Sequence, residues 1–206
     1  MTLRARARSA RRLVSCLAAA LALAGCGGAQ TGPSEAAEDP LAPANLYPLA
    51  EGNVWSYNVR SAEDEPPTLE VRRVVSAEGA RVEVESWGGE RVVYELRPGG
   101  IYRPGFDVWL LKAPVRPGAT WPSASGRTAR VASVDVAVEV PAGRFTGCVR
   151  VEERGGDAEL SVATIYCPGV GPVHVESGMR ADLTGMRAHV VGKLLGYELE
   201  GASSVE

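Results

Sequence analysis

The sequence predicts an all-β domain: a single antiparallel, curved sheet, either a half-barrel or a closed barrel, of roughly ten strands. Two observations support this prediction. From residue 46 onward, apolar and polar residues alternate with period two in one segment after another, which is typical of strands with one buried face. Glycine, proline and aspartate separate these segments at short intervals, and no segment after residue 26 sustains a helical period.

The alternating segments are the predicted strands. Residues 80–87 (ARVEVESW) show the pattern clearly, because Val82 and Val84 fall on one face and charged residues fall on the other. Residues 133–140 repeat the pattern with four valines. The remaining alternating segments are residues 53–59, 68–75, 90–96, 147–153 and 158–166, and the turns between segments are predicted at 63–67, 87–90, 97–100, 116–119, 141–143 and 154–157.

Residues 106–115 (FDVWLLKAPV) depart from the alternation. Trp109, Leu110 and Leu111 are apolar in succession, so both faces of this segment are apolar. A strand buried on both sides has this pattern, and so has a strand that lines a lipophilic cavity. Both interpretations stay open at this point.

The segment PGVG, residues 168–171, has the glycine content of a phosphate-binding loop. Such a loop opens a helix whose N-terminus binds the anion, whereas the segment that follows here, PVHVE, has the pattern of a strand. We therefore predict a turn between two strands, in which Gly169 and Gly171 adopt positive φ angles.

Residues 1–25 have the composition of a lipoprotein signal peptide. Five arginines and no acidic residue precede an apolar run that is shorter than the about 20 residues needed to span a bilayer. The run closes on Leu-Ala-Gly-Cys at residues 23–26, which resembles the lipobox of bacterial lipoproteins. The resemblance implies that Cys26 is lipidated and becomes the N-terminus, anchoring the protein to a membrane. The alternative is an ordinary secretory signal with an incidental cysteine.

Residues 26–45 are predicted to be the lipidated cysteine and a flexible linker, because they are small, polar and interrupted by proline. The all-β domain is predicted to span residues 46–206. Lipoproteins retained in the inner membrane carry an aspartate after the lipidated cysteine, whereas this chain has Gly27. The resemblance therefore implies a location in the cell envelope at the outer membrane.

The charge of the exported chain disfavours one class of partner. Removal of the first 25 residues leaves 17 basic and 25 acidic residues, a net charge of −8. An acidic surface repels phosphate backbones, so we expect no nucleic-acid partner.

Cys148 and Cys167 are predicted to form a disulfide, because paired cysteines are usual in oxidising compartments. The register of their two strands decides whether the two cysteines lie close enough to form the bond. If paired residue numbers sum to 315, the cysteines face each other and residues 156–159 form the loop; a tight turn at Gly155-Gly156 gives a sum of 311. The second register separates the cysteines by roughly 13 Å, beyond bridging distance.

Three longer segments resemble recurring motifs of uncharacterised bacterial lipoproteins: YPLAEGNVWSYNV, VEVPAGRFTGCVRVEE and YCPGVGPVHVE. The family has no assigned activity, and some members are thought to form a curved antiparallel sheet like the half-barrels that carry lipids across the periplasm. The resemblance implies that its motif residues mark the fold. The matching residues here are Trp55, Tyr57, Pro141, Gly143, Phe145, Cys148, Tyr166, Pro168, Gly169, Gly171 and Val173.

No recognised catalytic motif stands in the sequence, so we expect no enzymatic activity, catalytic residue, cofactor or metal. His174 and His189 are predicted to be structural, because no carboxylate cluster accompanies them. Two functions remain. The first is a membrane-anchored binding or structural module for an unknown protein or glycan partner. The alternative is a periplasmic half-barrel that carries a lipid or lipopeptide. The ligand-binding residues are not predicted.

Overall fold

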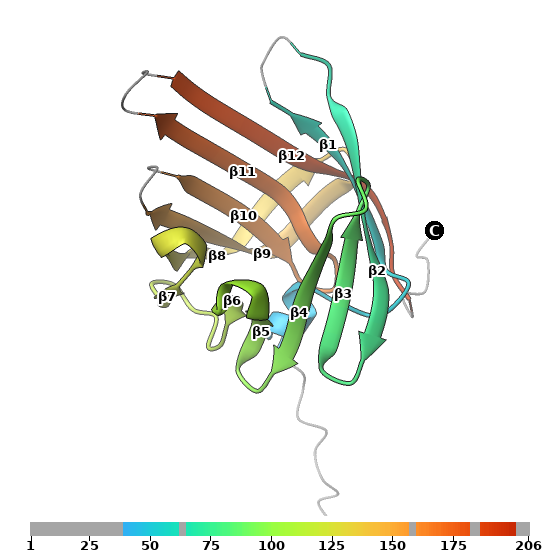
Figure 1. Ribbon diagram of the computed structural model, residues 1–206. Helices are drawn as coiled ribbons and strands as arrows, with labels where there is room; N and C mark the ends of the chain where they lie inside the picture. Colours follow the sequence, from blue (N-terminus) through green and yellow to red (C-terminus); the bar gives the residue numbers. More distant parts are fainter. Residues whose placement is uncertain (1–38, 62–64, 157–159, 182–185, 201–206) are drawn as a thin grey trace, which may run out of the picture. The chain divides into compact units, whose positions relative to one another are not determined.

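The computed structural model describes residues 39–61, 65–156, 160–181 and 186–200. Within these residues the chain forms twelve strands, one short α-helix and two 3-10 turns (Figure 1). The elements are α1 (Pro43–Leu46), β1 (Val54–Arg60), β2 (Thr68–Glu78), β3 (Arg81–Ser86), β4 (Arg91–Arg97), β5 (Gly100–Arg103), η1 (Pro104–Phe106), β6 (Val108–Lys112), β7 (Thr120–Pro122), η2 (Ala124–Gly126), β8 (Arg127–Val140), β9 (Gly143–Gly155), β10 (Ser161–Cys167), β11 (Gly171–Ala181) and β12 (Met186–Glu198).

All twelve strands belong to one antiparallel sheet with the order β6-β5-β4-β3-β2-β1-β12-β11-β10-β9-β8-β7. Every hydrogen-bonded pair joins neighbours in the sequence except β1 with β12, which links the first strand to the last. The two edges of the sheet, β6 and β7, are also consecutive, and the Trp121 indole N–H donates across them to the Trp109 carbonyl at 3.1 Å. The predicted all-β, curved antiparallel fold is therefore confirmed, with two strands more than the roughly ten expected.

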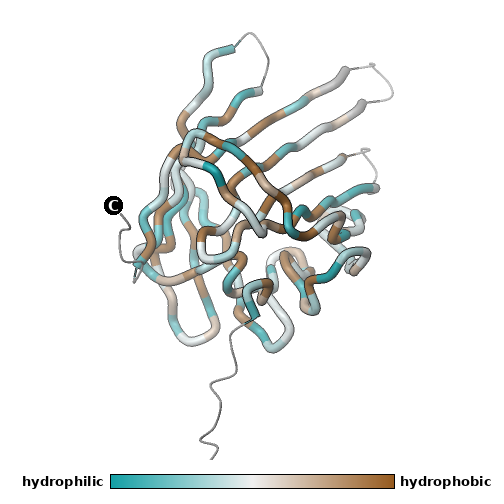
Figure 2. The backbone as a smooth tube through the Cα atoms, turned by 180° about the vertical axis from the view of Figure 1, so that it is seen from behind, coloured by the Kyte–Doolittle hydropathy of each residue, from teal (hydrophilic) through white to brown (hydrophobic). Residues whose placement is uncertain are grey.

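Period-two burial follows the predicted pattern, and Figure 2 shows hydrophobic and hydrophilic residues alternating along the strands. Val82 and Val84 are buried, whereas Arg81 between the turn and Val82 is exposed. The register shifts at several points, among them Ser56/Tyr57 in β1 and Ile165/Tyr166 in β10. Such irregularities bend a strand and increase its twist, which allows the sheet to curve round on itself.

The hairpin of β8 and β9 is long enough to reach across the neighbouring strands. At its tip the Ala142 amide donates to the Leu194 carbonyl of β12 at 3.0 Å. Nearby, the rings of Phe145 and Tyr197 lie 6.3 Å apart. The predicted valine face of residues 133–140 packs against the core, although only Val140 is fully buried.

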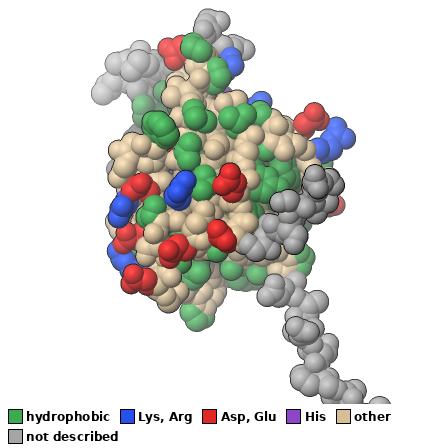
Figure 3. Space-filling view, turned by 90° about the vertical axis from the view of Figure 1, so that its right-hand side faces the viewer, with side chains coloured by type: hydrophobic (Ala, Val, Ile, Leu, Met, Phe, Trp, Pro, Cys, Tyr) green, Lys and Arg blue, Asp and Glu red, His purple; other side chains and the backbone are tan. Residues whose placement is uncertain are grey.

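The outer face of the sheet carries ion pairs between neighbouring strands. Arg91 of β4, for example, contacts Glu85 of β3 at 2.8 Å. On the side drawn in Figure 3, acidic and basic side chains are intermixed with apolar ones. Exposed pairs of this kind contribute about 0–1 kcal/mol each and indicate a solvated surface.

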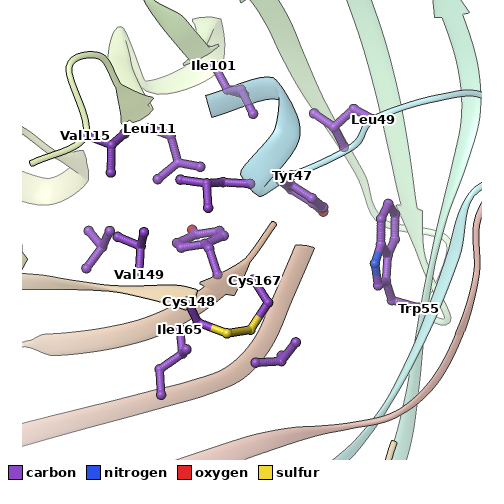
Figure 4. Close-up of a cluster of buried hydrophobic side chains, with 14 of the residues drawn as sticks. Tyr47, Leu49, Trp55, Ile101, Leu111, Val115, Cys148, Val149, Ile165 and Cys167 are labelled. Atoms are coloured by element: carbon purple, nitrogen blue, oxygen red, sulfur yellow. A yellow bond between two sulfur atoms is a disulfide. The ribbon is translucent and has the colours of Figure 1, made fainter. Parts of the chain in front are cut away.

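The hydrophobic core fills one end of the concave side of the sheet (Figure 4). Helix α1 lies inside this end, with Leu46 fully buried and Tyr47 almost so. Pro43 is buried as well, so the folded chain extends to the N-terminal side of the predicted boundary at residue 46. Residues 43–45 were expected to belong to a flexible linker, but the apolar side chains of this four-residue helix pack into the sheet.

The turn at residues 168–171 fastens β1 to β11. The Trp55 indole N–H donates to the Val170 carbonyl at 2.7 Å, and the Tyr57 hydroxyl donates to the Pro172 carbonyl at 2.9 Å. Gly171 has a φ of 110°, and a Cβ there would lie 3.0 Å from the Trp55 indole nitrogen. The predicted glycine turn is confirmed, and the motif residues Trp55, Tyr57 and Gly171 act together in it.

Cys148 and Cys167 form a disulfide between β9 and the end of β10. The strand register pairs Val162 with Glu153 and Tyr166 with Val149, so the residue numbers sum to 315. In the loop-entropy model a bridge of this sequence separation stabilises the fold by about 3 kcal/mol. Most of the predicted loop at residues 156–159 lies outside the described residues.

The predicted signal peptide at residues 1–25, the predicted lipidation site Cys26 and the part of the predicted linker up to residue 38 also lie outside the described residues. Among the residues that the structure does describe, no helix has the length and apolar character needed to cross a membrane.

Candidate functional site

Beyond the core, the concave side of the sheet encloses a cavity of about 780 Å³ that opens to solvent. Its walls come from both halves of the chain, since β2 to β6 line one side and β8 to β11 line the other. Ligand sites in proteins commonly have volumes of roughly 300–1,000 Å³. We call this space the concave cavity.

Three tyrosines form the boundary between the core and the concave cavity. The ring of Tyr47 lies 6.0 Å from that of Tyr94 and 6.5 Å from that of Tyr166. Burial raises the pKa of all three phenols, so their hydroxyl groups stay protonated and can donate hydrogen bonds.

One charged pair stands on β2. The Arg72 guanidinium contacts Glu70 at 2.7 Å and lies 5.6 Å from the centre of the Tyr57 ring. Burial by itself lowers the pKa of Arg72. The neighbouring Tyr47, Glu70 and Tyr57 raise it by more than burial lowers it, so the net pKa is raised. Both members of this pair line the cavity.

A second charged pair stands on the opposite wall. The Nε of Arg127 on β8 lies 3.2 Å from the Glu153 carboxylate on β9, and the Ser123 hydroxyl also hydrogen-bonds that carboxylate. The two charged side chains are only 9% and 17% exposed. This pair is therefore the best shielded of the ion pairs among the described residues.

Arg103, at the end of β5, differs from the other two cavity arginines. Its Nε is buried and has no hydrogen-bond partner, and none of the carboxylates in the described part of the chain forms an ion pair with it. Its guanidinium lies over the Phe106 ring at 4.5 Å. Arg103 lines the concave cavity together with Tyr94 and Tyr166, and its positive charge opposes the effect of burial on the pKa of both phenols.

The rest of the wall and the rim combine apolar side chains with a few polar ones, among them Ser86, Thr164 and Glu90. Val92, Leu110, Val162 and Val175 line the interior. At the rim, Trp87 in the turn between β3 and β4 is 75% exposed, which is unusual for so large an apolar side chain. The concave cavity therefore offers apolar surface, phenolic donors and charged groups together.

The structure resolves the two interpretations of residues 106–115. Leu111 belongs to the core and Trp109 packs against Tyr102, with ring centres 5.4 Å apart, whereas Leu110 lines the concave cavity. Leu111 is thus the one fully buried residue of β6, Trp109 and Leu110 are partly exposed, and Leu110 contributes to the cavity lining, so the segment has features of both interpretations.

The two histidines lie away from the concave cavity. His174 stands between Val173, which is in the core, and Val175, which lines the cavity, so it points to the opposite face. His189 is exposed and lies 3.8 Å from Glu176. In the described ranges, no group of three or more His, Cys, Asp or Glu side chains could hold a metal ion.

The charged residues of the cavity are not among the residues that the sequence predicts to be functional. A signal was present in β2, where Glu70, Arg72 and the buried Val74 stand two residues apart and share a face. Charges on the same face as a core valine indicate a polar interior. The pattern indicates a polar cavity only if the concave face of the sheet is known, and the alternation of residues alone does not show which face is concave.

No protein-family model and no curated protein matches the sequence. Two solved structures are similar. One is a protein from Bacteroides fragilis NCTC 9343, described as exported and as having a YmcC-like fold, with 14% identity and a TM-score of 0.46. The other, from Parabacteroides distasonis ATCC 8503, is described as a lipoprotein, with 15% identity and a TM-score of 0.44. Each similarity covers 74% of this chain and 98% of the other.

Proposed function

We propose that this protein is a lipid-anchored binding protein of the cell envelope that holds a ligand in the concave cavity. The observation that carries this proposal is the 780 Å³ cavity, whose walls come from both halves of the sheet. The N-terminal sequence supports the location, because the basic head, the short apolar run and the lipobox-like end at Cys26 occur together. Gly27 favours the outer membrane in this scheme.

The lining of the cavity favours a binding protein for a ligand with polar groups over a carrier of acyl chains alone. Arg72, Arg127 and Arg103 all reach the cavity, and the first two bring Glu70 and Glu153 with them. An acyl chain in contact with these groups would desolvate them without offering hydrogen bonds, which is unfavourable. The ligand that fits has polar groups of its own, and nothing in the proposal requires that it be chemically changed.

Native mass spectrometry of the full chain, extracted in mild detergent from the envelope, tests the binding function. We expect a ligand to leave with the protein in a defined ratio. Val92→Trp places an indole ring inside the cavity from β4 and obstructs part of it, whereas Val93→Trp places the same side chain on the outer face of the same strand. The ligand should be lost in the first variant and kept in the second; loss in neither variant would overturn the proposal.

The anchor has a separate test. Metabolic labelling with a palmitate analogue should mark the full chain, and Cys26→Ser should abolish the label. Fractionation of inner and outer membranes then locates the labelled protein. An unlabelled wild-type chain would contradict the lipid anchor and leave the cavity proposal standing.

A further inference from the structure

We infer that the ligand is an amphipathic anion whose charged group, a carboxylate or a phosphate, is bound by Arg103 with the hydroxyl groups of Tyr94 and Tyr166 beside it. This inference rests on the proposed binding function and specifies its ligand class.

The charge balance of the cavity leaves Arg103 without an ion-pair partner among the residues that the structure describes. Arg72 is paired with Glu70, and Arg127 is paired with Glu153. Glu90 also lines the cavity, but it is exposed at the rim and forms no ion pair with Arg103 in the described part of the chain. A half-buried guanidinium without a carboxylate lacks compensation for its lost hydration, and an anionic ligand would provide it.

Arg103 supplies hydrogen-bond donors that suit an oxyanion, in a cavity that Tyr94 and Tyr166 also line. Its Nε is a buried donor that lacks an acceptor. The guanidinium lies over the Phe106 ring at 4.5 Å from its centre, a contact with the face of the ring that leaves its N–H groups available. Arginine presents several N–H groups in a planar fork that matches carboxylate and phosphate oxygens. Two phenolic hydroxyls nearby, kept protonated by burial, add donors and no acceptor charge.

The apolar part of the lining gives the ligand its second property. Val92, Leu110, Val162 and Val175 line the cavity, and Trp87 stands at the rim. A small inorganic anion would leave these side chains in contact with water. An anion attached to an apolar body would cover them, so the cavity fits an amphipathic molecule better than a simple ion.

Calorimetric titration of the full chain in neutral-lipid nanodiscs tests the inference. The probes are octyl phosphate and octanoate as anions, 1-octanol as the neutral molecule of the same chain length, and inorganic phosphate as the charged group alone. We expect both amphipathic anions to bind at least about tenfold more tightly than 1-octanol. The ranking of the two anions distinguishes a phosphate from a carboxylate ligand.

Variants assign the effect to the site. Arg103→Gln should weaken octyl phosphate binding about tenfold or more, while Arg130→Gln, which removes an exposed arginine of β8, should not change it. Circular dichroism checks that each variant folds. Tyr94→Phe is a second test with less risk to folding, and we expect a loss of a few-fold.

The possible results distinguish a failure of the anion site from a failure of the proposed binding function of the cavity. Equal binding of octyl phosphate and 1-octanol, lost in Val92→Trp but not in Arg103→Gln, would overturn the anion site and leave the cavity function in place. Binding that no Val92 substitution affects would overturn both.

Discussion

The concave side of this sheet has two regions that meet at Tyr47 and are built in opposite ways. In the core region, around α1 and the disulfide, Leu46, Trp55 and Leu111 are fully buried, and the Trp55 N–H has a backbone partner. In the cavity region, charged side chains point inward and the Nε of Arg103 lacks a partner. One end of the sheet therefore supplies the stability that allows the other end to keep an incompletely satisfied polar surface.

The largest expected change in the free energy of unfolding comes from a substitution in the core, and the matched substitution at the rim should change it little. Trp55→Ala removes a fully buried ring and its hydrogen bond, and should lower the free energy of unfolding by about 3–5 kcal/mol. Trp87→Ala removes an exposed ring and should change it by no more than about 0.5 kcal/mol. Denaturant unfolding measures both, and similar losses would show that the rim is part of the core.

The disulfide is the next largest contribution to the core region. Replacing both Cys148 and Cys167 with serine should lower the free energy of unfolding by about 3 kcal/mol, because the unfolded chain regains its freedom. The same denaturant titration, carried out on the wild type with and without a reducing agent, gives the control. An unchanged midpoint after complete reduction would contradict this contribution.

Replacing either of two cavity arginines with glutamine should have different effects on the stability of the fold. Arg127→Gln leaves the shielded Glu153 carboxylate without its charged partner, and should cost about 1–3 kcal/mol of stability. Arg103→Gln removes a charge that has no carboxylate partner, so the stability should stay within about 0.5 kcal/mol or rise. Thermal unfolding of the two variants tests this contrast. A large loss in Arg103→Gln would indicate a structural role for that residue.

The smallest effect concerns His174, on the face opposite the cavity. Burial lowers the pKa of its imidazole below the ordinary value near 6.5, so the unfolded chain takes up this proton at a higher pH than the folded chain does. Stability should therefore fall as the pH drops below about 6.5. His174→Gln should flatten that part of the stability curve between pH 7 and 5.5, and an unchanged slope would contradict the assignment.

The sequence was informative about strands and less so about what they enclose. Alternation predicted the strand that holds Val82 and Val84, and the spacing of Cys148 and Cys167 reduced the register to two choices. The pairing of β1 with β12 is not encoded in any local pattern, because it joins the ends of the folded chain. Arg103 ends a strand of four residues, GIYR, which is too short for alternation to show which face it occupies. Helix α1 is likewise too short to have a period.

Photo-crosslinking in living cells is the direct test of whether the concave cavity is the binding site. A photoreactive phenylalanine placed at Val92 faces the cavity, and one placed at Val93 faces outward from the same strand. We expect a small-molecule adduct, identified by mass spectrometry, at position 92 and none at position 93. Adducts at position 93 alone would place the functional surface on the outer face and contradict the account.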